Sequence, residues 1–310
     1  MAYPIAGSLA VGTAASPAYS GTFIPEIWSA KLVEKFYDAT VLSAISNTDY
    51  EGEIKNQGDK VNIRTKPSIT IRTYDNGQAL TLERPSSNIV SLLIDKGYYW
   101  NVVLDDVMET QMDIKMLSKW AEDASEQLKI VIDTAVLATI SAGVAAANKG
   151  LTAGRISGNI SLGTTAAPTS ISKTTVIDKI VDMGQALDEQ NIPETGRWLL
   201  VPSWMAARIK KSDLKDASLT GDAQTPLRNG RLGMIDRFTL YTSNLLPASG
   251  ATYTKMYAGH NNGLTFASQI SKVETMRSEL TFGQIMRGLS VYGSKVVDGT
   301  CIVEMVGVAA

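Results

Sequence analysis

One long helical periodicity constrains this chain of 310 residues more than any other feature. From Val103 to Ala138, apolar residues recur in alternating steps of four and three, and no proline or glycine occurs between Asn101 and Ala142. This spacing predicts an amphipathic helix of about 55–60 Å, since each residue adds 1.5 Å. A free coiled coil is the alternative, but the flanking positions lack regular opposed charges. We therefore expect a spine helix along which other elements pack.

A long segment of extended backbone, residues 52–85, precedes the spine. Residues 60–66 alternate between polar and apolar side chains, which is typical of a half-exposed strand. A second and a third extended run flank the sequence Asp75-Asn76-Gly77, which predicts a turn. The segment has few large apolar residues, and a two-stranded ribbon is barely stable alone in water. We expect this ribbon to lie on something other than itself.

The remaining segments predict an α+β protein. Residues 1–22 are rich in small residues and predict an extended arm, and a helix begins at Pro25 and ends near Ser46. Between residues 150 and 262 helical and strand patterns alternate, which indicates a mixed α/β lobe. Within it we predict strands at 197–201 and 238–241, and a short helix that begins at Pro202-Ser203. After residue 263 the pattern predicts strands, and we expect them to form an antiparallel sheet packed on the spine helix.

Composition excludes several classes of function. Lys and Arg total 29 against 31 Asp and Glu, so the net charge of −2 argues against a dedicated nucleic-acid binder. One cysteine and one histidine exclude an intramolecular disulfide and a zinc site of Cys and His ligands. No apolar run is long enough to span a bilayer, so we expect no membrane partner. The N-terminus lacks the basic segment of a signal peptide.

No catalytic, cofactor-binding or metal-binding residue is predicted. His260 stands in a turn-like sequence with no nucleophile motif beside it, and we expect a structural hydrogen-bonding residue. Cys301 stands in an apolar run and is expected to be a small buried side chain. Phosphate-binding loops and serine-nucleophile motifs are absent from the sequence.

Several segments, taken in order, resemble the major capsid (coat) proteins of tailed bacteriophages with the Hong Kong 97-type fold. The segments that carry the resemblance are 198–205 (WLLVPSWM), 230–238 (GRLGMIDRF), 243–247 (SNLLP), 258–260 (AGH) and 264–267 (LTFA). No single motif is diagnostic; the specificity lies in the order of the segments, and the resemblance covers nearly the whole chain.

The resemblance implies a division of the chain into four parts. Residues 1–50 would form an N-terminal arm and helix, and residues 51–86 the extended loop that reaches over a neighbouring subunit. Residues 87–149 and 263–310 would form a peripheral domain with the spine helix, and residues 150–262 an axial domain. Intersubunit contacts are expected from charged side chains of the extended loop: Lys60, Arg64, Lys66, Arg72 and Asp75.

The implied function is structural. Pentamers and hexamers of this chain would build an icosahedral head shell around double-stranded DNA, which they would contact non-specifically. Portal and scaffolding proteins are expected partners, decoration proteins are further candidates, and assembly would take place in the host cytoplasm. Two alternatives stay open: a nanocompartment shell of the same fold with a protein cargo, and a soluble α/β enzyme. We expect deletion of residues 55–82 to leave a folded monomer that forms no shells.

Overall fold

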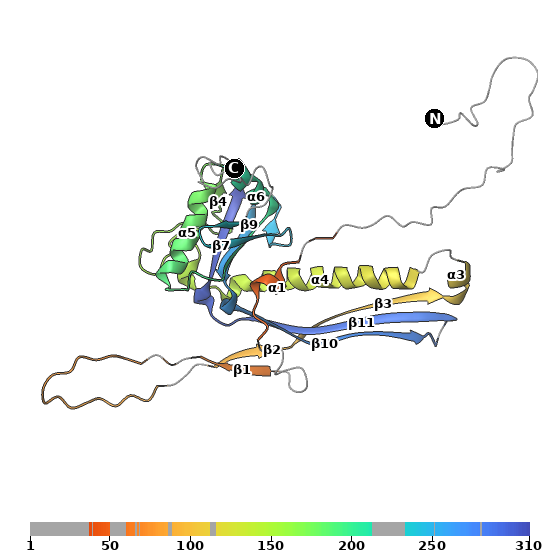
Figure 1. Ribbon diagram of the computed structural model, residues 1–310, viewed down its shortest axis with the longest axis horizontal. Coiled ribbons are helices and arrows are strands. Elements are labelled where there is room, and N and C mark those ends of the chain that lie inside the picture. Colours follow the sequence, from red (N-terminus) through yellow and green to blue (C-terminus); the bar gives the residue numbers. More distant parts are fainter. Residues whose placement is uncertain are drawn as a thin grey trace, which may run out of the picture. The chain divides into compact units, whose positions relative to one another are not determined.

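The computed structural model describes residues 37–38, 40–49, 60–65, 67, 69–85, 89–111, 116–212, 233–250, 252–279 and 281–310. The chain divides into two units, Met1–Lys35 and Phe36–Ala310, and every described residue belongs to the second. The predicted N-terminal arm and the start of the predicted helix at Pro25 lie outside the described residues. The second unit combines helices with β-sheets, so the α+β prediction is confirmed (Figure 1).

The spine is helix α4, Met116–Gly143, whose 28 residues span about 42 Å. A short separate helix, α3 (Asp106–Gln111), precedes it, and residues 101–105 belong to strand β3 (Lys96–Asp105). The prediction of one helix from Asn101 is therefore wrong at its N-terminal end. Val103 lies opposite Ile285 of a strand far along the chain, and this long-range backbone pairing overrides the local helical spacing.

Beside α4 lies an antiparallel sheet in the order β10 (Leu264–Arg277), β11 (Gly283–Val296) and β3. The helix contacts both β11 and β3, and Figure 1 shows it lying along this sheet. Gly288 lies opposite Trp100, whose indole fills the space that a Cβ at Gly288 would take. The prediction of C-terminal strands packed on the spine is confirmed for β10 and β11.

A four-residue helix, α1 (Leu42–Ile45), is held on the spine by Asp133. The buried Asp133 carboxylate accepts hydrogen bonds from the backbone N–H of Val41 at 2.7 Å and of Leu42 at 3.3 Å. Burial raises the pKa of this carboxyl, although both N–H donors act in the opposite direction. Tyr37, Asp38 and Val41 are not helical. The helix was predicted to run from Pro25 to near Ser46. Within the described residues, it consists only of the four residues of α1.

We expect Asp133→Ala to lower the free energy of unfolding by about 1–3 kcal/mol, because two buried N–H groups would lose their acceptor. Asp133→Asn is the matched control, since its amide oxygen can accept the same bonds. Denaturant unfolding measures both variants. An alanine variant as stable as the asparagine variant would show that Asp133 does not hold α1.

The larger sheet has its strands in the order β4-β12-β9-β5-β7-β6, with β8 paired to β9. These strands are β4 (Thr169–Ile171), β5 (Arg197–Val201), β6 (Met234–Ile235), β7 (Phe238–Thr242), β8 (Ala248–Ser249), β9 (Tyr253–His260) and β12 (Ile302–Ala309). Short 3₁₀ turns connect elements at Ala146–Asn148, Asn261–Gly263 and Gly299–Cys301. The predicted strands at 197–201 and 238–241 are confirmed.

Helices cover both faces of this sheet. One face packs with α5 (Val176–Glu189) and α6 (Ser203–Lys211) around buried residues such as Leu199 and Met305. The other face packs with the C-terminal half of α4, where Leu137 shares a buried cluster with Leu200. A strand buried on both faces is expected to be continuously apolar, which explains the run from Trp198 to Val201. Among the described helices, none is long and apolar enough to cross a membrane.

Strand β12 belongs to the larger sheet and not to the sheet beside the spine. It pairs antiparallel with β9 and parallel with β4. The prediction that every strand after residue 263 forms one sheet on the spine is therefore wrong for residues 302–309. The physical reason is burial: Ile302 to Gly307 are buried on both sides of the strand, and the larger sheet has cover on both faces.

Candidate intersubunit contact sites

The base of the predicted ribbon is a two-stranded antiparallel sheet, β1 (Lys60–Arg64) and β2 (Ile89–Leu93). Exposure alternates along β1, as predicted, and Ile63 is buried in a cluster with Leu92 and Ala267. Because Ala267 comes from β10, the base of the ribbon is part of this chain's own core. A deletion that begins at residue 55 would remove that core strand as well as the ribbon.

Beyond the base, two arms of extended backbone meet at the predicted turn. The N–H of Gln78 donates to the carbonyl of Asp75 at 3.0 Å, and Gly77 has a φ of 87°, which glycine adopts readily. A hydrogen bond of 3.3 Å from Thr70 Oγ1 to Glu83 Oε1 links the arms. Residues 69–85 contain no β-strand, so the two further extended runs predicted there are extended backbone without ladder pairing.

The arms carry large apolar side chains that their own chain does not cover. Every residue from 69 to 85 is exposed; Ile71 is 89% exposed and Leu82 is 95% exposed. Thr70 and Glu83 face each other, and side chains alternate along extended backbone, so Ile71 and Leu82 share the opposite face. We call the following residues the apolar face of the ribbon: Ile69, Ile71, Leu80 and Leu82.

The predicted contact residues lie on the ribbon and its base. Lys60 and Arg64 are exposed on β1, and Arg72 and Asp75 are exposed on the arms. Lys66 lies outside the described residues. Within the described part of the chain, the other four form no salt bridge. That a second copy supplies their partners stays a prediction.

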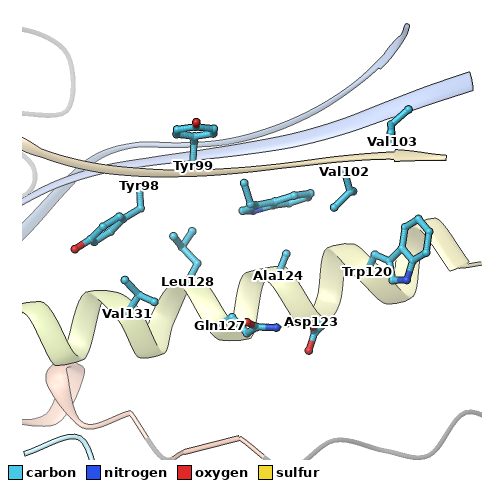
Figure 2. Close-up of a pocket in the computed structure, with 11 residues that line it drawn as sticks. Tyr98, Tyr99, Val102, Val103, Trp120, Asp123, Ala124, Gln127, Leu128 and Val131 are labelled. Atoms are coloured by element: carbon cyan, nitrogen blue, oxygen red, sulfur yellow. Dashed lines mark hydrogen bonds between the residues drawn. The ribbon is translucent and has the colours of Figure 1, made fainter. Parts of the chain in front are cut away.

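A groove of about 580 Å³ separates β3 from the N-terminal half of α4 (Figure 2). We call it the aromatic groove; its main lining residues are Tyr98, Trp100, Val102, Trp120, Ala124, Leu128 and Val131. Figure 2 shows Tyr98 and Val102 directed toward the helix, whereas Tyr99 and Val103 lie on the other side of the strand. Val131 is 44% exposed, so the groove is open to solvent.

The sequence predicted contact between the spine and the sheet, but it did not predict this groove. Trp120, Ala124 and Leu128 follow the helical spacing of a face that meets a sheet. Ala124 is too small to fill the space between its larger neighbours. The signal that could have indicated a binding surface is the run Tyr98-Tyr99-Trp100, since aromatic residues are enriched at interfaces.

On the side of α4 directed away from β3, Asp123 accepts a hydrogen bond from the Tyr37 hydroxyl at 2.6 Å. This bond raises the pKa of Tyr37 to about 12. Asp123 and Asp133 together hold Tyr37, Val41 and Leu42 along the spine.

His260 is a structural hydrogen-bonding residue, as predicted. Its Nδ1 accepts from the backbone N–H of Asn262 at 3.2 Å and caps the 3₁₀ turn between β9 and β10. Cys301 is 8% exposed, which confirms the predicted buried side chain. Burial, and then the charge of Asp298, raises the pKa of its thiol to about 11. The thiol therefore stays protonated at neutral pH and is a poor nucleophile.

In the described part of the chain, no group of three or more His, Cys, Asp and Glu side chains is placed to hold a metal ion. The features that do stand out are the exposed apolar face of the ribbon and the open aromatic groove. Both are suited to contact between macromolecules.

Comparison with known proteins shows which family and which solved structures this chain resembles. Residues 92–305 match a family model described as phage capsid protein. A solved structure from Mycobacterium phage Che8 is 26% identical, with a TM-score of 0.76, covering 93% of this chain and 98% of that one. The capsid structure of the cyanophage P-SCSP1u has a TM-score of 0.67 at 17% identity, covering 93% of each chain. No curated protein matches the sequence.

A third similar structure is the capsid of a native GTA particle, with a TM-score of 0.65 at 12% identity, covering 96% of this chain and all of that one. The likenesses below 25% identity show the fold alone, and they extend over almost the whole chain. The predicted Hong Kong 97-type fold is thereby confirmed. The family match covers well over half of the 310 residues. The chain belongs to the phage capsid protein family and is a shell-forming structural protein of the tailed-phage virion.

Proposed function

We propose that pentamers and hexamers of this chain form an icosahedral head shell that encloses double-stranded DNA. The observation that carries the proposal is the ribbon, whose residues 69–85 are exposed throughout although four of them are large aliphatic side chains. Full burial of such a side chain stabilises by about 1.5–3 kcal/mol, and its own chain leaves this stabilisation unused. A neighbouring subunit can supply the missing cover.

The four-part division of the chain belongs to this proposal, with one change. Residues 87–149 and 263–301 would form the peripheral domain around α4, and residues 51–86 the extended loop. The axial domain would comprise residues 150–262 together with β12, because β12 pairs with β9 and β4. Residues 1–50 would form the N-terminal arm and helix.

The proposed partners follow from the same role. With a net charge of −2, the chain is suited to weak, non-specific contact with DNA and not to tight binding by each subunit. Portal and scaffolding proteins would act during assembly in the host cytoplasm, and decoration proteins could bind the finished shell. The free energy gained from intersubunit contacts is partly offset by the rotational and side-chain freedom that the subunits lose on association. Because each subunit makes several modest contacts, each contact stays reversible and errors of assembly can be corrected.

The test is electron microscopy of the full-length protein and of particles from producing cells. We expect closed shells of uniform diameter, sedimenting far above the 33.3 kDa subunit, with nuclease-protected double-stranded DNA inside the particles from producing cells. A protein cargo in place of DNA would favour the nanocompartment alternative. A small oligomer at every concentration would contradict the proposed shell and reopen the enzyme alternative.

A further inference from the structure

A carboxylate is buried between the larger sheet and the C-terminal part of the spine helix. Glu304 of β12 is 6% exposed. It alternates along the strand with Val303 and Met305, which pack in the cluster on the side of α5 and α6, so its side chain is directed toward α4. That side of the sheet packs in the cluster that contains Leu137 and Leu200. A buried charge in such surroundings is stable only when it is both paired and hydrogen-bonded.

One oxygen of this carboxylate has a charged partner, and the other has none. Glu304 Oε1 lies 3.6 Å from Nζ of Lys255 on the neighbouring strand β9. The same Nζ donates to Ser141 Oγ of α4 at 2.7 Å. In the described part of the chain, Oε2 of Glu304 is buried and has no hydrogen-bond partner. A buried charged oxygen costs its full desolvation free energy unless a donor reaches it.

The hydroxyl of Tyr257 is a second buried polar group without a partner, and it lies on the same side of the sheet. Tyr257 lies directly opposite Glu304 in the antiparallel pair of β9 and β12, so both side chains leave the sheet toward α4. The residue is fully buried, and its hydroxyl has no hydrogen-bond partner among the described residues. Burial, and then the charge of Glu304, raises the pKa of Tyr257. A protonated hydroxyl therefore lies near a free carboxylate oxygen without a bond between them.

We propose that one ordered water molecule binds between the Tyr257 hydroxyl and Oε2 of Glu304. The water accepts a hydrogen bond from the hydroxyl and donates one to the carboxylate. Lys255 Nζ carries three N–H groups and gives one to Ser141, so it can supply a further bond. Buried water in proteins makes about three such bonds, to polar groups that otherwise have no partner. This inference concerns a single subunit and goes beyond the proposed shell.

The charges of the site select a neutral ligand. Lys255 and Glu304 carry opposite charges, so together they have no net charge. A metal cation would be repelled by the ammonium group of Lys255, and an anion would be repelled by the free oxygen of Glu304. Water both donates and accepts hydrogen bonds, which is what a hydroxyl and a carboxylate oxygen together require.

The water completes a chain of polar contacts that joins the larger sheet to the end of the spine helix. Ser141 lies two residues before the end of α4, so its carbonyl is among the last four, which have no partner within the helix. Lys149 Nζ donates to this carbonyl at 3.2 Å, and Lys255 donates to the hydroxyl of the same residue. Cations are favourable at the C-terminus of a helix. By fixing Glu304, the water keeps the counter-charge of Lys255 in place.

The test is a density map of the full-length protein at a resolution that shows ordered water, from crystals of the subunit or from assembled particles. We expect a peak about 2.5–3.0 Å from both the Tyr257 hydroxyl and Glu304 Oε2. Water peaks elsewhere in the interior serve as the control for the quality of the map. In such a map, an empty site or a direct hydrogen bond between Tyr257 and Glu304 would overturn the proposal. Either result leaves the proposed shell untouched, because the site lies within one chain.

A double-mutant cycle measures whether the two groups are linked in energy. Tyr257→Phe removes the hydroxyl and should raise the equilibrium constant of unfolding about fivefold. Glu304→Met removes the acceptor, and the double variant should fall short of the product of the two single effects by at least about twofold. Tyr292→Phe is the matched control, since Tyr292 of β11 is also fully buried, and its effect should multiply with that of Glu304→Met. Effects of Tyr257→Phe and Glu304→Met that multiply fully would contradict a shared water.

Discussion

Replacing residues 67–85 with a short Gly-Ser linker is expected to leave a folded monomer that forms no shells. The linker joins the paired ends of β1 and β2, where Arg64 lies opposite Ile89, so a short connection suffices. It keeps Ile63 in its buried cluster, which a deletion starting at residue 55 would not. Because Pro67 and residues 69–85 are exposed, the free energy of unfolding should change by less than about 1 kcal/mol.

The measurements are analytical ultracentrifugation, electron microscopy and denaturant unfolding. Point variants separate loss of apolar contact from loss of chain length. The double change Ile71→Ser and Leu82→Ser should remove about 3–6 kcal/mol from each ribbon contact and prevent assembly. The matched control is Thr70→Ser with Thr81→Ser, which alters the opposite face and should leave assembly intact. Unfolding of the linker variant would show that the ribbon serves its own subunit. Shells formed by this variant at wild-type concentration would show that assembly does not need the ribbon.

Asp188→Ala is expected to destabilise the subunit strongly, although the substituted side chain lies at the surface, because it leaves a buried cation unpaired. The guanidinium of Arg197 is buried, with the residue 1% exposed, and its Nη2 lies 2.7 Å from Asp188 Oδ1. Nε and Nη2 also donate to the carbonyls of Pro193 and Ile192, at 2.8 and 2.6 Å. In the described part of the chain Nη1 has no hydrogen-bond partner, and Asp188 is the carboxylate in salt-bridge contact with the group.

Removing one member of a buried ion pair lowers stability by about 3–5 kcal/mol, because the other charge stays buried and unpaired. The Asp188 side chain is 41% exposed and partly solvated, so we expect about 2–4 kcal/mol. Arg237→Gln is the matched control. It removes the other cation that binds Asp188, at 2.9 Å, but Arg237 is exposed and its pair should contribute less than about 1 kcal/mol.

Denaturant unfolding of the unassembled subunit measures both changes, since assembly would add a concentration-dependent contribution. Equal destabilisation by the two substitutions would show that burial of Arg197 does not decide the effect. Stability unchanged by Asp188→Ala would show that the carbonyls of Ile192 and Pro193 hold the guanidinium without a counter-charge.

Elements set by local chemistry were predicted correctly from the sequence. The apolar run at 197–201 predicted a buried strand, and Pro202-Ser203 predicted the start of the helix that follows. Asp75-Asn76-Gly77 predicted the turn at the tip of the ribbon. In each case the residues that determine the conformation are neighbours in the chain, so no distant contact is needed to recognise them.

The candidate site was predicted only in part. The sequence predicted that the ribbon, with few large apolar residues, needs something other than itself to lie on, and the exposure of residues 69–85 agrees with this prediction. The predicted contact residues were chosen for their charge, whereas the structure draws attention to the apolar face on the same ribbon. The aromatic groove was not predicted, because its walls are Trp100 and Trp120 on elements that only packing brings together.

What the sequence determined by itself is the set of local elements, the family resemblance carried by their order, and a ribbon with too few large apolar side chains to be stable alone. Only the tertiary structure decided which strands pair with one another. Strand β3 takes Asn101 to Asp105 away from the spine helix because β11 offers them partners, and β12 joins the larger sheet because that sheet is covered on both faces. These partner strands lie more than 40 residues away along the chain. A hydrophobic periodicity indicates which face of a segment is apolar, but it does not indicate which distant segment will cover that face.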